Sequence, residues 1–198
     1  MIRELFNERN KNLKPVWFMR QAGRHLPEYH SIRNKYKDFK DFCLDTKGII
    51  DASLLPLKHY NIDAAILFTD ILIIPHLLGQ NVTFIKGQCP YLSKVNLNKS
   101  FLTKDVDYSI LNPIKESIAK IKLKLNEKQD LIGFCGAPWT LSCYMIERST
   151  SKDFNKTRLF LWNNERAFDN LINKLTNECI NLLELQYNSG ANVLMIFD

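Results

Sequence analysis

Three arginines lie close together near the start of the sequence, in the segment 15–33, PVWFMRQAGRHLPEYHSIR. Arg20, Arg24 and Arg33 carry planar guanidinium groups, which bind carboxylate or phosphate oxygens through paired hydrogen bonds. Gly23 between the first two is expected to allow a positive φ and a close backbone approach to a ligand. The spacing alone also fits a solvated basic loop. The apolar run 16–19 favours an anion site, because large apolar side chains beside the arginines are expected to be buried.

A carboxylate follows a short apolar run further along the chain. Residues 63–68 read DAAILF, and Thr69 and Asp70 come next. A carboxylate at the end of a buried strand loses solvation and needs hydrogen-bond donors or a cation. Asp70 is therefore a candidate to accept ligand N–H groups or to stabilise developing positive charge. The alternative is that Asp70 only caps the turn at 71–74.

Two further side chains are candidates for the same kind of site. Tyr144 lies one to two helical turns after Pro138, and its hydroxyl could contact a ligand carboxylate or Asp70. A tyrosine packed in the core is the alternative. Asp198 also follows an apolar run, at 192–197, which makes it a candidate of the same type as Asp70. No Ser/His/Asp order and no activated cysteine signature is present.

Cysteine and histidine spacing gives no metal site. The five cysteines are widely separated and form no CxxC pair. This usage predicts reduced thiols in a cytosol-like compartment, with neither a disulfide framework nor a bound metal. The four histidines lack metal-ligand spacing. His25 could add positive charge to the arginine loop, whereas His59 and His76 are expected on helix surfaces or in packing.

The elements that would position these residues alternate between strand and helix. Apolar runs predict buried strands at 63–68, 130–135 and 192–197, and an extended segment at 15–19. Helical spacing predicts a helix from Pro27, one at about 45–60 that Pro56 kinks or stops, one from Asn112 and a long one at about 165–187. This order favours a parallel sheet covered by helices. Without GxGxxG or GxxxxGK[ST], a (β/α) barrel is favoured, with its functional residues just past the strand ends.

Length and composition bound the class of protein. The 198 residues carry a net charge of +6, but the lysines are spread along expected helix faces and no run of five basic residues occurs. We therefore expect neither nucleic-acid binding nor a membrane span. Three clear strands cannot close a barrel of about 250 residues. Residues 1–198 are accordingly expected to be one domain that forms the N-terminal part of a (β/α)8 barrel.

The residues resemble a known family. The run 15–29, PVWFMRQAGRHLPEY, resembles the first signature of the uroporphyrinogen decarboxylase family, and 133–147, GFCGAPWTLSCYMIE, resembles its second. The segment 63–79, DAAILFTDILIIPHLLG, is similar to the family's strand with its functional aspartate. The segment 188–198, NSGANVLMIFD, is similar to the segment that precedes a substrate-binding serine.

The resemblance implies a (β/α)8 barrel, usually a homodimer, that acts in haem and chlorophyll synthesis in the cytoplasm. Such an enzyme removes carbon dioxide from the four acetate arms of uroporphyrinogen III to give coproporphyrinogen III, without metal or organic cofactor. Substrate carboxylates would be bound by Arg20, Gln21, Ala22, Gly23, Arg24 and Arg33. Asp70 would accept the pyrrole N–H groups and stabilise the protonated pyrrole, with Tyr144 beside it. Catalysis would then rest on Asp70, Arg20 and Tyr144.

The sequence also departs from the family pattern. His25 stands where tyrosine is usual, Cys135 where a small residue is usual, and His76 where a less basic residue is common. The segment that supplies the family's serine and a histidine near its C-terminus is absent. Two rival readings therefore remain: a zinc-dependent methyltransferase of the same superfamily, and an inactive tetrapyrrole-binding fragment.

Overall fold

The computed structural model describes residues 2–6, 14–85, 87–97, 99–103 and 105–198. The chain divides into two compact units, which we describe separately. The first unit comprises Met1–Thr69, Leu111–Phe134 and Leu183–Met195. The second unit comprises Asp70–Ile110, Cys135–Leu182 and Ile196–Asp198.

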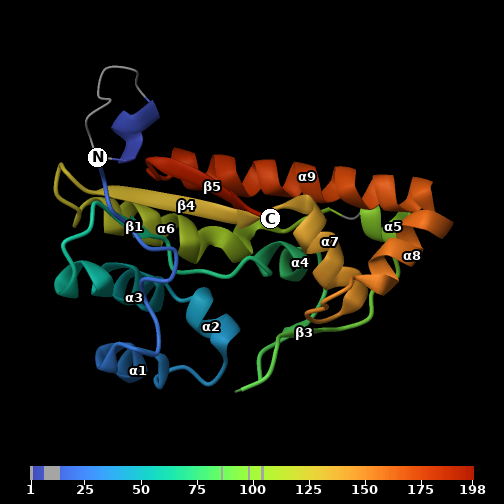
Figure 1. The fold of residues 1–198 in the computed structure, drawn as a ribbon, viewed down its shortest axis with the longest axis horizontal. Coiled ribbons are helices and arrows are strands. Elements are labelled where there is room, and N and C mark those ends of the chain that lie inside the picture. The colour runs from blue at the N-terminus through green and yellow to red at the C-terminus, as the bar shows by residue number, and fades with distance from the viewer. Residues whose placement is uncertain (1, 7–13, 86, 98, 104) are drawn as a thin grey trace. The chain divides into compact units, whose positions relative to one another are not determined.

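Helices of the first unit follow the amphipathic pattern of the sequence. They are the 3-10 helix η1 (Ile2–Phe6) and the α-helices α1 (Pro27–Arg33), α2 (Phe39–Cys43), α3 (Thr46–His59) and α6 (Asn112–Lys122). Asp45 caps α3, because its Oδ2 accepts the Gly48 N–H at 2.7 Å. Pro56 does not stop this helix, which continues to His59. α3 packs against α1, α2 and α6 (Figure 1).

Three strands of the chain form a sheet with the order β1-β4-β5. Its strands are β1 (Ala64–Ile66), β4 (Asp130–Gly136) and β5 (Val193–Phe197). β1 pairs with β4 in parallel, with Ala64 opposite Asp130. The Asn192 N–H donates to the Leu131 carbonyl and the Ala137 N–H to the Phe197 carbonyl, so β5 has the same direction. The long helix α9 (Glu165–Asn188) lies between β4 and β5 in the sequence (Figure 1).

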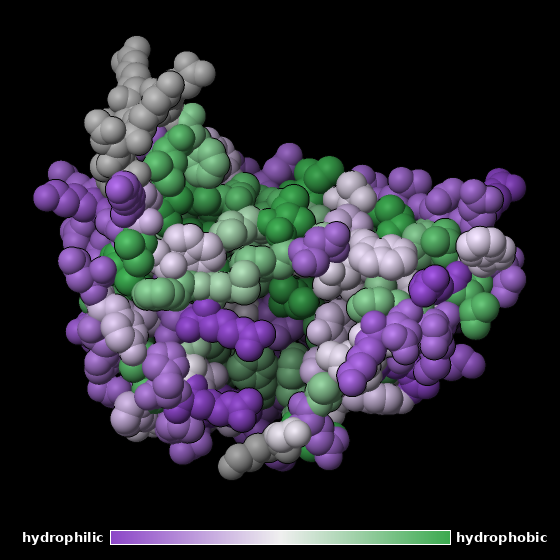
Figure 2. Space-filling model, viewed as in Figure 1, coloured by the Kyte–Doolittle hydropathy of each residue, from purple (hydrophilic) through white to green (hydrophobic). Residues whose placement is uncertain are grey.

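Of the three predicted strands, one is buried throughout, one is shorter than predicted and buried in part, and one is not buried on both faces. Every residue of β4 is buried, and so are Ala64 and Ala65 of β1. β5 alternates instead, with Leu194 38% and Ile196 60% exposed. The prediction of a strand buried on both faces is therefore wrong for β5, where only one face is packed. Figure 2 shows hydrophobic surface in the area where Figure 1 draws β4 and β5.

A buried glutamine on α9 completes the hydrogen bonding of β4. Gln186 is fully buried; its Nε2 donates to the Phe134 carbonyl at 2.9 Å, and its Oε1 accepts the Phe134 N–H at 2.7 Å. One side-chain amide thus satisfies both peptide groups of a strand residue. A Cβ added to Gly133 would lie 2.3 Å from Gln186 Oε1, so this strand position requires glycine.

The second unit contains mainly helices. They are α4 (Ile73–Leu77), α5 (Lys99–Leu102), the 3-10 helix η2 (Tyr108–Leu111), α7 (Pro138–Glu147) and α8 (Asn155–Asn163). This unit also holds the strand β3 (Tyr91–Leu92), which pairs antiparallel with β2 (Val82–Thr83). Among the described residues, no helix is long and apolar enough to cross a membrane.

The loop between α7 and α8 has strained backbone at both ends. Arg148 has φ 69° and Phe154 has φ 51°, in the left-handed region that non-glycine residues rarely adopt. Arg148 is held there by its Nε, which donates to the Leu92 carbonyl at 3.1 Å, and by its contact with the Tyr91 ring. Such strain persists only where neighbouring contacts fix the backbone.

An ion pair fixes η1 at the amino end of β4. The Asp130 side chain is fully buried, and its Oδ1 lies 3.3 Å from Arg3 Nη1, while its Oδ2 accepts the Arg3 backbone N–H at 2.9 Å. Replacing Arg3 with methionine is expected to lower the free energy of unfolding by about 1–3 kcal/mol, because a buried carboxylate loses its cation. Urea unfolding measures this loss. A loss no larger than that of Arg166→Met, an exposed arginine on α9, would contradict the prediction.

Candidate functional site

The arginine loop follows an extended segment that lies beside β1. The Asp63 N–H donates to the Val16 carbonyl at 2.8 Å, and the Val16 N–H donates to Asp63 Oδ2 at 2.6 Å. The segment is extended, as predicted, but it is not a regular strand. Arg20 and Arg24, which follow it, both have exposed side chains. Their guanidinium groups are therefore accessible to a ligand.

Two expectations about this loop are wrong. Trp17 is half-buried against Ala64 and Ile132, but Phe18 is 55% and Met19 57% exposed, because the chain turns away from β1 at this point. Gly23 does not use a positive φ. The turn is instead closed by the Leu26 N–H, which donates to the Gly23 carbonyl at 3.0 Å. The burial argument for an anion site therefore holds only for Trp17.

The Arg33 side chain is partly engaged by its own surroundings. Its Nη1 donates to the Tyr36 carbonyl at 2.6 Å, and its guanidinium lies 5.8 Å from the centre of the Phe39 ring. Burial and Cys43 raise the pKa of Tyr29, while the positive charges of Arg33 and Arg24 oppose this rise. The charges of two of the three predicted arginines thus act on the same tyrosine of α1.

Asp70 is both a turn cap and a desolvated carboxylate. Its Oδ1 accepts the Leu72 N–H at 2.8 Å, and its carbonyl accepts the Ile73 N–H at 3.2 Å, so it caps the turn into α4. Burial raises the pKa of Asp70 to about 6, although the Leu72 N–H favours the charged form. The two interpretations of Asp70 are thus compatible. Such a carboxylate is costly to ionise and gains most from a cationic or N–H-rich partner.

Tyr144 and Asp70 lie near each other in the second unit. Tyr144 is half-buried on α7; burial raises its pKa most, and the negative charge of Asp70 raises it further. The charge of Asp70 thus acts on the tyrosine of the second signature. A hydroxyl that stays protonated beside a carboxylate can donate a hydrogen bond to it or to a ligand.

Tyr144 lines a small cavity that the sequence did not reveal. The cavity has a volume of about 140 Å³ and includes Trp139, Thr140 and Ser149. Thr140 Oγ1 donates to Asp198 Oδ1 at 2.9 Å, which joins the second candidate carboxylate to α7. Thr140 was missed as a site residue. Its only signal is a hydroxyl two residues after Pro138, at the start of a helix that follows a strand.

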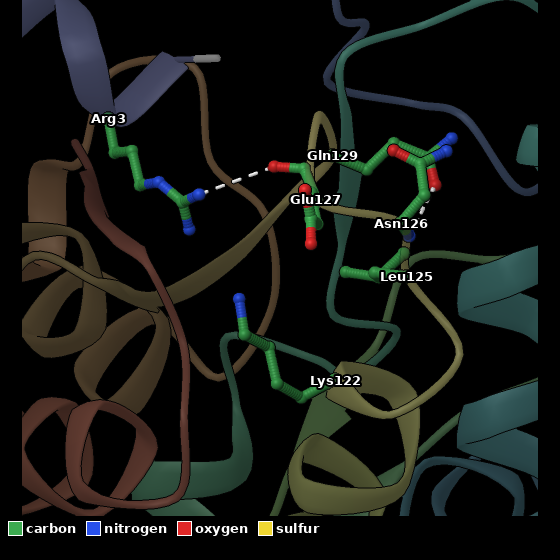
Figure 3. Close-up of a pocket in the computed structure, with 6 residues that line it drawn as sticks. All are labelled: Arg3, Lys122, Leu125, Asn126, Glu127 and Gln129. Atoms are coloured by element: carbon green, nitrogen blue, oxygen red, sulfur yellow. Dashed lines mark hydrogen bonds between the residues drawn. The ribbon is translucent and has the colours of Figure 1, made fainter.

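The first unit has a cavity of its own, lined by Arg3, Lys122 and residues of the segment 125–129. It has a volume of about 440 Å³, and Arg3 and Lys122 both reach toward it (Figure 3). Lys122 Nζ donates to Asn192 Oδ1 at 2.7 Å, and Arg3 Nη2 donates to the Glu127 carbonyl at 3.3 Å. Both cations thus donate hydrogen bonds to oxygen atoms of the fold, in contrast to the exposed Arg20 and Arg24.

The thiols are arranged for packing. Four of the five cysteines are buried, and Cys179 Sγ lies 3.3 Å from the Gly136 carbonyl. A hydrogen bond from Cys179 lowers the pKa of Cys135 and raises that of Cys179. In the described part of the chain, no group of three or more His, Cys, Asp or Glu side chains could hold a metal ion.

Fold and site together define a class: an α/β protein with the architecture of the N-terminal part of a (β/α)8 barrel, carrying polar side chains just past its strands. The family described as uroporphyrinogen decarboxylase (URO-D) matches residues 2–198. The chain belongs to this family.

Curated relatives agree with this assignment. Uroporphyrinogen decarboxylase of Rickettsia felis is 41% identical over 192 residues, which cover 96% of this chain and 56% of the relative. That of Mesorhizobium japonicum is 40% identical over 185 residues, covering 93% of this chain and 54% of the relative. The chain thus spans about half the length of these relatives.

A solved structure, a methyltransferase from Methanosarcina mazei, has a similar fold. Its TM-score is 0.70 at 12% sequence identity, over 93% of this chain and 54% of that one. At this identity the similarity concerns the fold alone.

Proposed function

We propose that this protein decarboxylates the four acetate side chains of uroporphyrinogen III to give coproporphyrinogen III in haem or chlorophyll synthesis. The observation that carries the proposal is Asp70, a desolvated carboxylate with a pKa of about 6 that follows β1 in a chain of this family. Tyr144 beside it and the exposed Arg20 and Arg24 supply the other groups that such a substrate needs.

The arginines bind and orient the substrate in this proposal. Uroporphyrinogen carries carboxylate arms around a ring of pyrrole N–H groups. Arg20, Arg24 and Arg33 bind carboxylate arms through charge-assisted hydrogen bonds, together with the backbone of Gln21, Ala22 and Gly23. Binding through several arms fixes the ring, so one acetate at a time is held at the reacting position.

Asp70 acts at the centre of the ring. Its carboxylate accepts hydrogen bonds from pyrrole N–H groups and stabilises the cation that forms when a ring carbon adjacent to the acetate arm is protonated. The bond between the acetate methylene and its carboxylate then breaks, and its electron pair flows into the cationic pyrrole. Carbon dioxide leaves, a proton added to the methylene carbon gives the methyl group, and loss of the proton first added to the ring carbon restores the pyrrole. Tyr144 orients Asp70 by a hydrogen bond.

The proposal extends to the organisation of the protein. We propose that residues 1–198 form a single domain, the N-terminal portion of the barrel, and that the whole protein is a cytoplasmic homodimer. Neither nucleic acid nor a membrane is expected as a partner. No metal or organic cofactor takes part in the proposed reaction.

A turnover assay with a chelator tests the proposal against the zinc-dependent methyltransferase. The full-length protein is expected to convert uroporphyrinogen to coproporphyrinogen under anaerobic conditions, at the same rate with and without EDTA. Chromatography of the oxidised porphyrins measures the substrate and each partly decarboxylated product. Loss of activity with EDTA that zinc restores would favour the metal-dependent alternative. Absence of product from the intact protein would favour the inactive tetrapyrrole-binding alternative.

A further inference from the structure

The side chain of Gln21 points away from solvent and pairs with the edge of β1. Gln21 is only 3% exposed, although Arg20 beside it is exposed. Its Nε2 donates to the Ala64 carbonyl at 2.8 Å, and its Oε1 accepts the Ile66 N–H at 3.3 Å. These two peptide groups belong to residues two apart in the same strand. A neighbouring parallel strand bonds in the same way to residues two apart.

The amide of Gln21 therefore takes the place of a strand peptide. A side-chain amide has one carbonyl acceptor and N–H donors, the same groups as a peptide unit. Backbone pairing with β1 occurs upstream, between Val16 and Asp63. After that point the chain turns away to present the two arginines. Gln21 keeps this departing loop attached to the strand without requiring its backbone to follow the strand.

The loop is fixed again on its far side. The Gly23 carbonyl accepts the Leu26 N–H, and Leu26 is 4% exposed in the cluster that contains Tyr29. His30 Nε2 lies 2.9 Å from the Arg24 carbonyl. The backbone that carries Arg20 and Arg24 thus runs from the Gln21 attachment at β1 to the start of α1. The position of the guanidinium groups depends on both attachments.

We propose that Gln21 is a positioning residue, whose buried amide holds the backbone from Arg20 to Arg24 against β1 so that both guanidinium groups are preorganised for carboxylate arms. The inference rests on the proposed function for the identity of the ligand. It assigns to the side chain of Gln21 a role distinct from substrate contact. Preorganisation matters here because ordering a flexible loop on binding would cost part of the binding free energy.

The substitution Gln21→Met tests this role, because methionine fills a similar volume but makes neither hydrogen bond. In the full-length protein, KM for uroporphyrinogen is expected to rise about tenfold, with kcat changing less. Gln186→Met is the matched control: this glutamine is also buried and also pairs with both an N–H and a carbonyl of a strand, but it lies on α9. It is expected to lower Tm while leaving KM within about twofold.

A double-variant comparison separates positioning from direct substrate contact. If Gln21 acts through the arginines, Gln21→Met is expected to raise KM much less in an Arg20→Met, Arg24→Met background than in the wild type. Equal factors in both backgrounds would overturn the proposal. So would an unchanged KM in Gln21→Met, or equal KM changes in Gln21→Met and Gln186→Met.

Hydrogen exchange tests the loop independently of turnover. The amides of residues 22–25 are expected to exchange faster in Gln21→Met than in the wild type and in Gln186→Met. If the wild type has no activity but the loop amides exchange faster in Gln21→Met than in the wild type, the proposed function is refuted and the positioning role is retained. Unchanged exchange in an active protein would refute the positioning role alone. If Gln21→Met does not fold, Gln21→Glu replaces it, because the protonated carboxyl has the same donor and acceptor. The ratio of its loop exchange rate to that of the wild type at the same pH is expected to approach one as pH falls and to increase as pH rises. A ratio that does not change with pH would overturn the role.

Discussion

Turnover of uroporphyrinogen is expected to fall by about a hundredfold to a thousandfold when Asp70 is replaced by asparagine, the range seen when one electrostatic stabiliser is removed. Asparagine keeps an oxygen that can accept the Leu72 N–H, so the turn into α4 is retained. What is lost is the negative charge, which the proposed mechanism needs beside the protonated pyrrole. Steady-state kcat, measured by loss of the eight-carboxylate substrate, checks the prediction.

Asp107 provides the matched control for this substitution. Its Oδ1 accepts the Ser109 N–H at 2.9 Å, the same bond to the residue two positions on that Asp70 makes. Asp107→Asn is therefore expected to leave kcat unchanged. If Asp70→Asn retained kcat within about threefold of the wild type, Asp70 would be only a turn cap, and the proposed mechanism would be wrong.

The substitution Asp70→Asn is also expected to stabilise the fold above pH 6. Burial raises the pKa of Asp70 from 3.8 to about 6, so between these values the folded state binds more protons than the unfolded state. Stability therefore decreases as pH rises from about 4 to 6, by at most about 3 kcal/mol. Asp70→Asn removes this loss. Its unfolding free energy is expected to exceed that of the wild type at pH 8 and to match it near pH 4.

Activity and stability thus depend on pH in opposite directions. The wild-type kcat/KM is expected to fall as pH drops below about 6, because Asp70 becomes protonated while the arginines stay charged. Urea unfolding and initial rates measured over the same pH range test both dependences on one protein. A stability advantage of Asp70→Asn that did not vary with pH would contradict the assigned desolvation. In the pH range where ionised Asp70 supports activity, its charge destabilises the fold, as is expected for a desolvated catalytic carboxylate.

Local sequence patterns predicted the elements and the order of the candidate residues. The apolar run at 130–135 predicted β4 because a strand buried on both faces leaves no polar position. Apolar residues at helical spacing predicted α9, because one face of such a helix is buried; Gly190, at φ 116°, follows its end. The position of Asp70 after β1 followed from the run before it. Each of these inferences depends on residues that are adjacent in sequence.

The features that were missed depend on contacts between distant residues. Gln21 and Ala64 are 43 residues apart, and Thr140 and Asp198 are 58 apart. No periodicity reports that a glutamine amide will pair with a strand edge, since the same residue type is usually solvated. The exposure of Phe18 and Met19 has the same origin. The apolar character of these two side chains favours their burial, but the loop leaves β1 before they can pack.

Replacing Arg20 with methionine is the other change with a large expected effect. The value of kcat/KM is expected to fall about tenfold to a hundredfold, because a charge-assisted hydrogen bond to a carboxylate contributes about 1.5–3 kcal/mol. Arg20→Lys keeps the charge but not the planar fork, so an intermediate loss is expected. Steady-state kinetics at low and high salt measure both variants. The kcat/KM of the wild type is expected to depend more strongly on salt than that of Arg20→Met, which has lost the charge.

Single and double variants of Arg20 and Arg24 show whether the loop binds one carboxylate arm or two. Arg166→Met removes an equivalent exposed charge from α9 and is expected to leave kcat/KM unchanged; an equal loss there would mean that only net charge matters. If Arg20 and Arg24 bind separate carboxylate arms, the losses of the single variants multiply in the double variant. If they clamp one carboxylate together, the second substitution adds little. Two arms held at once would fix the ring against rotation, so the double variant would also release more partly decarboxylated products.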